Sequence, residues 1–304
     1  MNLQRLKGNF ILLFASFIWG LAFIAQSKGV ESVPPSLFNG LRTLLGGLVL
    51  LPIVLFINFK NKKKGIKTDK KTLLLGGIIC GDLLCLASTV QTIGLLYTSP
   101  GKAGFITALY MVIFPIIGIL RGKVPRFSVL LSVLIAIVGL YLMCIDTAFN
   151  INFGDILMLI CALLFSFHIL AVDYFSPKVE GVYLATIQFF VCGSLNLIYS
   201  FIFEDWHLAS IFNSYLSIGY AGIFSCGIAY TFQIVGQKYT DPTSASVLMS
   251  LESVFATLAT VVLTYMGWNF TGGKLTFKEI FGCVLMFVAI ILVQLPTKIK
   301  TENK

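Results

Sequence analysis

Charged residues and histidines are scarce in this chain of 304 residues. Only 12% of the residues are Asp, Glu, Lys or Arg, against 57% hydrophobic residues, and the mean hydropathy is +0.92. This composition excludes a water-soluble domain, because such domains carry about 25% charged residues. None of the seven cysteines lies in a C-x-x-C pair or at metal-ligand spacing from one of the two histidines. We therefore expect no metal, no cofactor and no disulfide, and interpret the cysteines as packing residues.

The sequence also lacks the motifs that an intramembrane enzyme needs. It contains no H-E-x-x-H motif, no nucleophile elbow and no paired acid motif, and His168 is the only histidine within an apolar run. A single histidine there fits either a proton shuttle or a residue that hydrogen-bonds a helix end. We therefore expect that the protein is not an enzyme.

Long apolar runs occupy almost the whole sequence. A helix needs about 20 apolar residues to cross a bilayer, and these runs are close to that length. They cover residues 8–27, 36–58, 72–95, 101–120, 127–145, 154–172, 182–203, 214–236, 243–266 and 277–295. Because the runs are continuous and do not alternate, they predict helices and not the strands of a membrane barrel. The expected fold is an all-α membrane protein with ten transmembrane helices.

The formal charge of +9 is explained by where the basic residues lie. With the N-terminus in the cytoplasm, 17 of the 22 Lys and Arg residues fall in inner segments, four fall in outer loops, and Arg42 lies inside a run. This distribution satisfies the positive-inside rule and places both termini in the cytoplasm of a multi-pass plasma (inner) membrane protein. Lys60 to Lys71 form either a solvated loop or a contact with anionic lipid. No nucleic-acid partner is implied.

An internal repeat divides the chain. The segment QTIGLLYTSPGKA (91–103) recurs as QIVGQKYTDPTSA (233–245), with six of thirteen positions identical at an offset of 142. Near the start of each half, aligning Gly8 with Gly154 gives an offset of 146. The halves are residues 1–148 and 149–304, with five predicted helices each. An odd number of spans places the second repeat upside down, so the sequence predicts two inverted five-helix repeats.

Several motifs resemble a known family. SFIWG at 16–20, Arg42 followed by small residues, Tyr97 to Ala103, and SLESVFATLATVVL at 250–263 resemble the EamA-like family of the drug/metabolite transporter superfamily. The resemblance covers essentially the whole chain and implies ten spans and export of small metabolites. The chain departs from the family's usual Gly-Glu pair after helices 4 and 9, because it has Gly122-Lys123 and Gly272-Gly273 there.

Two acidic residues lie in the middle of predicted helices. An acid at the centre of a bilayer costs about 2.5–3.5 kcal/mol, so neither Asp82 nor Glu252 is expected to face lipid. Glu252 fits a contact with a solute ammonium, a proton-carrying carboxyl or a structural anchor. Asp82 is the first candidate for a functional acid, because its counterpart at offset 142 is Phe224.

Polar and aromatic residues complete the candidate substrate site. Arg42 either clamps a carboxylate or phosphate or extends toward the interface, and its repeat counterpart Gln188 also has a polar donor. Trp19 and Tyr110 either stack on a flat substrate or pack in the core. Gln91 and Gln233, which are repeat counterparts, either cross-link helices or touch solute. The candidate substrate-binding residues are thus Trp19, Arg42, Asp82, Tyr110, Gln188 and Glu252.

The expected function is secondary transport by alternating access. Arg42, together with the two acids, suits a zwitterion, so small metabolites such as amino acids are the leading substrates, and an exporter is expected from the resemblance. A channel or receptor is the alternative, although neither a filter motif nor an appended domain is present. Proton-coupled and facilitative transport both fit the sequence. The sequence also leaves the oligomeric state open.

Overall fold

The computed structural model describes residues 3–63, 69–98, 100–120, 122, 127–144, 152–267 and 276–294. Within these ranges every regular element is a helix and no strand occurs. The first half contains α1 (Leu3–Val30), α2 (Pro35–Lys63), α3 (Lys70–Gly94), α4 (Pro100–Ala108), α5 (Tyr110–Leu120) and α6 (Phe127–Cys144). The second half contains α7 (Phe153–Phe175), α8 (Gly181–Phe203), α9 (Leu208–Asn213), α10 (Tyr215–Tyr220), the π-helix η1 (Ala221–Tyr230), α11 (Thr231–Gln237), α12 (Pro242–Met249), α13 (Glu252–Tyr265) and α14 (Phe277–Gln294). The all-helical prediction is confirmed for the described residues.

Eight segments in the described part of the chain are long and apolar enough to cross a membrane. They are Leu3–Val30, Pro35–Lys63, Lys70–Gly94, Pro100–Leu120, Phe153–Phe175, Gly181–Phe203, Tyr215–Gln237 and Pro242–Leu263. Two shorter apolar helices, Phe127–Gly139 and Ile280–Leu292, lie in the fifth and tenth predicted runs. Ten crossings stay a prediction, and the expected boundary between residues 148 and 149 lies outside the described residues.

Two of the predicted runs are interrupted helices. The run 101–120 is divided at Leu109, between α4 and α5, and the run 243–266 is divided at Ser250 and Leu251, between α12 and α13. At the second interruption the Ser250 hydroxyl donates to the Val247 carbonyl (2.8 Å). A serine that bonds back to its own helix in this way bends it. Leu109 and Leu251 are 142 positions apart, so the interruptions occupy the same place in both repeats.

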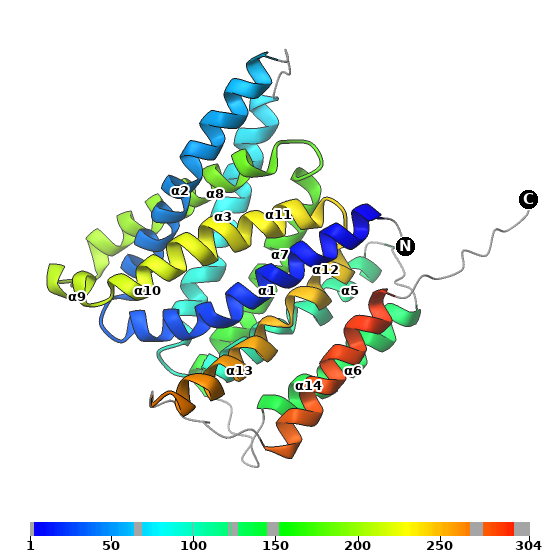
Figure 1. Ribbon diagram of the computed structural model, residues 1–304. Helices are drawn as coiled ribbons and strands as arrows, with labels where there is room; N and C mark the ends of the chain where they lie inside the picture. The colour runs from blue at the N-terminus through cyan, green and yellow to red at the C-terminus, as the bar shows by residue number, and fades with distance from the viewer. Residues whose placement is uncertain are drawn as a thin grey trace, which may run out of the picture.

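Helices of the two halves interleave around the centre of the bundle (Figure 1). α1 packs against α13, α11 and η1, while α2 packs against α8 and η1, and α3 against α7 and α8. α6 and α14 form a pair at one edge of the molecule. Close approach is achieved with glycine. A Cβ on Gly46 would lie 2.5 Å from Cys226 Cβ. Because glycine has no Cβ, α2 can pack directly against η1.

Where α1 begins, it crosses the end of α11, and we name this crossing the α1–α11 corner. A Cβ on Gly8 would lie 3.1 Å from the Gly236 carbonyl oxygen, so the two backbones touch. Next to this contact the Thr240 hydroxyl donates to Asn9 Oδ1 (3.0 Å). These two contacts hold the start of α1 to the end of α11 and to the loop that precedes α12.

The same arrangement recurs where α7 begins against the end of α3, which we name the α3–α7 corner. A Cβ on Gly154 would lie 2.8 Å from the Gly94 carbonyl oxygen. Here the Thr98 hydroxyl donates to Asp155 Oδ1 (3.0 Å). The residues that make these contacts are the repeat counterparts of those at the α1–α11 corner, at offsets of 142 and 146. Both halves therefore use one local packing solution.

Candidate functional site

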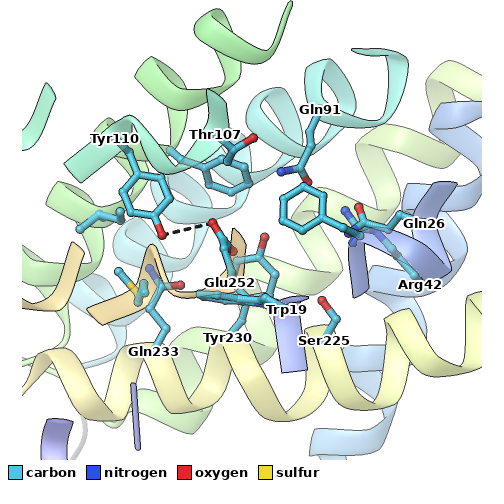
Figure 2. A pocket seen from close by; sticks show the side chains of 14 residues that line it. Trp19, Gln26, Arg42, Gln91, Thr107, Tyr110, Ser225, Tyr230, Gln233 and Glu252 are labelled. Carbon is cyan, nitrogen blue, oxygen red and sulfur yellow. Dashed lines mark hydrogen bonds between the residues drawn. The ribbon is translucent and has the colours of Figure 1, made fainter. Parts of the chain in front are cut away.

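A pocket of about 40 Å³ lies at the centre of the bundle, between the two halves (Figure 2). Its lining residues are Trp19, Phe23, Gln26, Arg42, Gln91, Thr107, Tyr110, Phe165, Ile169, Ser225, Tyr230, Gln233, Met249 and Glu252. A water molecule needs roughly 10–15 Å³ of such space, so the pocket has room for a few waters and must widen for a larger solute. Part of its wall is η1, and π-helical turns occur frequently at functional sites.

Tyr110 and Glu252 meet in this pocket. Tyr110 Oη donates a hydrogen bond to Glu252 Oε1 (3.2 Å), and Glu252 is 6% exposed. Each of the two is the first residue of the helix that follows an interruption, α5 for Tyr110 and α13 for Glu252. Their positions differ by 142, so they are repeat counterparts. The first turn of α13 also favours a carboxylate, because a helix N-terminus carries partial positive charge.

Other lining residues are counterparts as well. Gln91 and Gln233 both line the pocket, at the offset of 142. Trp19 and Phe165 do the same at the offset of 146. Since each half contributes equivalent positions, the pocket lies where the two repeats face one another.

In the view of Figure 2, Arg42 lies at the right-hand end of the pocket, and Glu252 lies near the middle. Arg42 is 2% exposed, and its Nε donates to Asn39 Oδ1 (2.7 Å). The Asn39 amide in turn donates to Thr92 Oγ1 (2.6 Å) and to the Ser88 carbonyl (3.0 Å), which fixes its orientation. Among the described residues no carboxylate lies within ion-pair distance of Arg42. A buried cation without a counter-ion is costly, so this end of the pocket is suited to an anionic group.

Three polar atoms of pocket residues have no hydrogen-bond partner among the described residues. They are the indole Nε1 of Trp19 and the amide oxygens of Gln26 and Gln233. Buried polar groups are nearly always hydrogen-bonded, so unpartnered ones that line a pocket indicate a ligand or water there. The Trp19 ring is held edge-on against Tyr230, with ring centroids 4.9 Å apart. The pocket therefore offers a donor and two acceptors besides its charged groups.

The glycine beside Trp19 makes room for a helix. A Cβ on Gly20 would lie 2.8 Å from the Ala256 backbone nitrogen and 2.8 Å from the Glu252 carbonyl oxygen. α13 thus packs directly on α1 at this level. The contact sets Trp19 and Glu252 in the same pocket wall.

Two of the predicted site residues lie outside the pocket lining. Gln188 is buried, and its Oε1 is hydrogen-bonded to His168 Nε2 (3.2 Å) behind the pocket wall. Asp82 is exposed on α3, on the same helix face as the exposed Ile78 and Leu86. The bundle does not enclose Asp82, contrary to the expectation from sequence.

The orientation of α3 follows from its glycines. A Cβ on Gly77 would lie 2.3 Å from Ile187 Cγ2, and one on Gly81 would lie 2.7 Å from Val191 Cβ. Only the small-residue face of α3 can therefore pack this closely against α8. Asp82, one residue further along, is turned outward.

The structure brings together four predicted residues, Trp19, Arg42, Tyr110 and Glu252. The sequence argument did not identify Gln26, Thr107, Ser225 and Tyr230 as lining residues. Ser225 and Tyr230 belong to η1, whose π-helical turns carry no signal in the apolar run. The offset of 142 could have paired Tyr110 with Glu252 before the structure was known. Within the described residues no cluster of His, Cys, Asp or Glu could hold a metal ion, and Cys80, Cys85, Cys161, Cys192 and Cys226 form no disulfide.

Comparison with known proteins gives consistent matches over the whole chain. The model of the EamA-like transporter family matches residues 6–145 and again 152–295. An "Uncharacterized transporter" of Archaeoglobus fulgidus is 32% identical over 97% of this chain and 88% of its own length. The "Uncharacterized inner membrane transporter YedA" of Escherichia coli K12 is 24% identical over 97% of this chain and 93% of its own. One solved crystal structure covers 95% of this chain and 98% of its own, with a TM-score of 0.72 and 19% identity, and this likeness supports the fold alone.

Proposed function

The chain belongs to the EamA-like transporter family, and from this premise we propose that it is a secondary transporter that exports small polar metabolites, amino acids among them, by alternating access. It is a multi-pass membrane transporter with two EamA repeats. In the proposal these repeats form two inverted halves of five helices, residues 1–148 and 149–304. They sit in the plasma membrane with both termini in the cytoplasm.

The observation that supports the proposal most is the meeting of Tyr110 and Glu252. Equivalent residues from the two repeats share a hydrogen bond of 3.2 Å inside a central pocket. Each is the first residue of the helix that follows an interruption. Interrupted helices at a repeat interface are typical of solute sites in secondary transporters. The α1–α11 and α3–α7 corners make equivalent contacts. In the proposal, the two halves tilt against one another about these two contacts.

The charges of the pocket favour a zwitterionic solute. Arg42 at one end would hold a carboxylate, and Glu252 near the middle would hold an ammonium group. Trp19 Nε1 would add a donor for the carboxylate, and Gln233 Oε1 an acceptor for the ammonium. An α-amino acid presents these two groups together. Asp82, which is exposed on α3, contributes nothing to this arrangement.

Counterflow in proteoliposomes tests the proposed function. Vesicles that contain the purified protein are preloaded in turn with each of the twenty protein amino acids, and uptake of the same labelled amino acid is measured. A secondary transporter accelerates labelled uptake when unlabelled solute is present inside, whereas a channel or an enzyme does not. Empty vesicles are the control. Absence of counterflow with every amino acid would refute amino-acid transport, and absence with a wider set of charged metabolites would refute secondary transport.

A further inference from the structure

A second group of unpartnered polar atoms lies at the α1–α11 corner. Both amide atoms of Gln237 and the Nδ2 atom of Asn9 are buried without a hydrogen-bond partner among the described residues. The two residues are 3% and 4% exposed. The Nε atom of Arg5 is also buried and unpartnered, although its Nη2 lies 3.6 Å from Asp241 Oδ1. An interior with this many open donors and acceptors holds water or a polar ligand.

This group continues the polar lining of the central pocket. Gln237 follows Gln233 by four residues in α11, and residues four apart lie on one face of a helix. Gln233 lines the pocket, and its Oε1 is itself unpartnered. Unpartnered polar atoms therefore extend from the pocket along α11 to the end of the helix.

The equivalent positions at the α3–α7 corner are apolar or fully hydrogen-bonded. Leu95, the counterpart of Gln237, is buried in the hydrophobic core. Asp155, the counterpart of Asn9, accepts from Thr98 Oγ1 (3.0 Å), from the Asn152 backbone amide (2.9 Å) and from Lys102 Nζ (2.5 Å). Neither Thr98 nor Asp155 has a buried polar side-chain atom without a partner, and the Leu95 side chain has no polar atom. The two corners share a backbone arrangement but differ in polarity.

We propose that the α1–α11 corner is a second binding station, which holds water at rest and the carboxylate of the solute in transit between the central pocket and the aqueous phase next to the N-terminus. The open groups of Arg5, Asn9 and the Gln237 amide are N–H donors, against one acceptor, the Gln237 oxygen. A donor-rich site favours an anionic, hydrogen-bond-accepting group. The assignment of solute to this station rests on the proposed transport function, whereas its hydration does not.

Cysteine labelling tests whether the corner is hydrated. Gln237→Cys and the counterpart Leu95→Cys are placed separately in the full-length protein in membrane vesicles, and modification by a small charged methanethiosulfonate is located by mass spectrometry. We expect modification at position 237 and none at position 95, with the native cysteines as an internal reference. Absence of modification at 237, or equal modification at 95, overturns the proposal.

Substitution with the counterpart residue tests the passage of solute. Gln237→Leu should lower the maximal rate of counterflow by at least about tenfold and leave ligand affinity at the central pocket, measured by thermal shift, within about twofold, because one hydrogen-bonding step is lost outside the pocket. Gln237→Asn keeps the amide and should retain most of the rate. Wild-type counterflow by Gln237→Leu overturns the station while the transport function stands. If the wild-type protein shows no counterflow, the transport function fails and the labelling result alone decides the hydration.

Discussion

Tyr110 donates to Glu252 across the central pocket, and the two residues occupy one and the same position in the two repeats. Each residue follows an interruption of its helix, so neither side chain is held by a continuous helix on both sides. A hydrogen bond between equivalent positions places the contact at the interface of the halves. A motion that tilts one half against the other therefore acts on this bond directly.

Substitutions of Arg42 distinguish two roles of this residue, a bidentate clamp for the solute carboxylate and an anchor at the membrane interface. Arg42→Lys keeps the charge but loses the planar fork that Asn39 orients, so we expect weaker binding of amino acids by about tenfold or more, and Arg42→Ala should be at least as weak. The measurement is the concentration dependence of counterflow. Normal transport by Arg42→Lys would contradict the clamp and leave Arg42 a structural cation.

Gly20 tests the contact between α1 and α13. Gly20→Ala would place a Cβ 2.8 Å from backbone atoms of α13, which cannot rotate away, so we expect destabilisation of about 1–3 kcal/mol or a displaced pocket. Gly219→Ala is the matched control, because a Cβ there meets nothing within 4 Å. Thermal unfolding in detergent compares the two variants. Equal stability would show that the α1–α13 contact is looser than described.

The pocket could be predicted in part from the sequence. Trp19, Arg42, Tyr110 and Glu252 are polar or aromatic residues in apolar runs, and such residues tend to face the interior of a membrane bundle. The rotation of α3 could not be predicted, because it depends on the fit of its glycines against Ile187 and Val191 of α8, which no periodicity within α3 reveals.

The helix interruptions were also missed, for a different reason. Leu109 and Leu251 are ordinary helix-forming residues in apolar runs, without a proline or glycine to mark a break. What distinguishes these positions is their recurrence at the offset of 142. Comparison of the two repeats, residue by residue, carries more information about such a site than either repeat alone.

If transport is proton-coupled, the coupling should depend on Glu252 and not on Asp82. Glu252→Gln keeps the shape of the side chain but removes its charge, so it should abolish uphill transport driven by a pH gradient. Asp82→Asn, on the exposed face of α3, should retain uphill transport, which reverses the order that the sequence suggested. Loss of uphill transport in Asp82→Asn alone would contradict the assignment. If both variants keep it, neither acid carries the coupling proton.

The orientation in the membrane can be tested at the ends of α2 and α8. A cysteine at Asn61, near the end of α2, should be labelled only from the cytoplasmic side, and one at His207, after the end of α8, only from outside. The physical basis is the excess of Lys and Arg around residue 61. Labelling of position 61 by an impermeant reagent in intact cells would reverse the orientation.

The central claim is that the solute binds between Arg42 and Glu252, with its ammonium group on the Glu252 carboxylate. The most direct test removes the charge of the ligand and the charge of the residue separately and compares the binding. Binding of a transported amino acid and of its N-acetyl derivative is measured by thermal shift in the wild-type protein and in Glu252→Gln. The account predicts that Glu252→Gln binds the free amino acid weaker by about tenfold or more and binds the N-acetyl derivative no weaker than the wild-type protein does. Equal weakening of both ligands, or of neither, would contradict it.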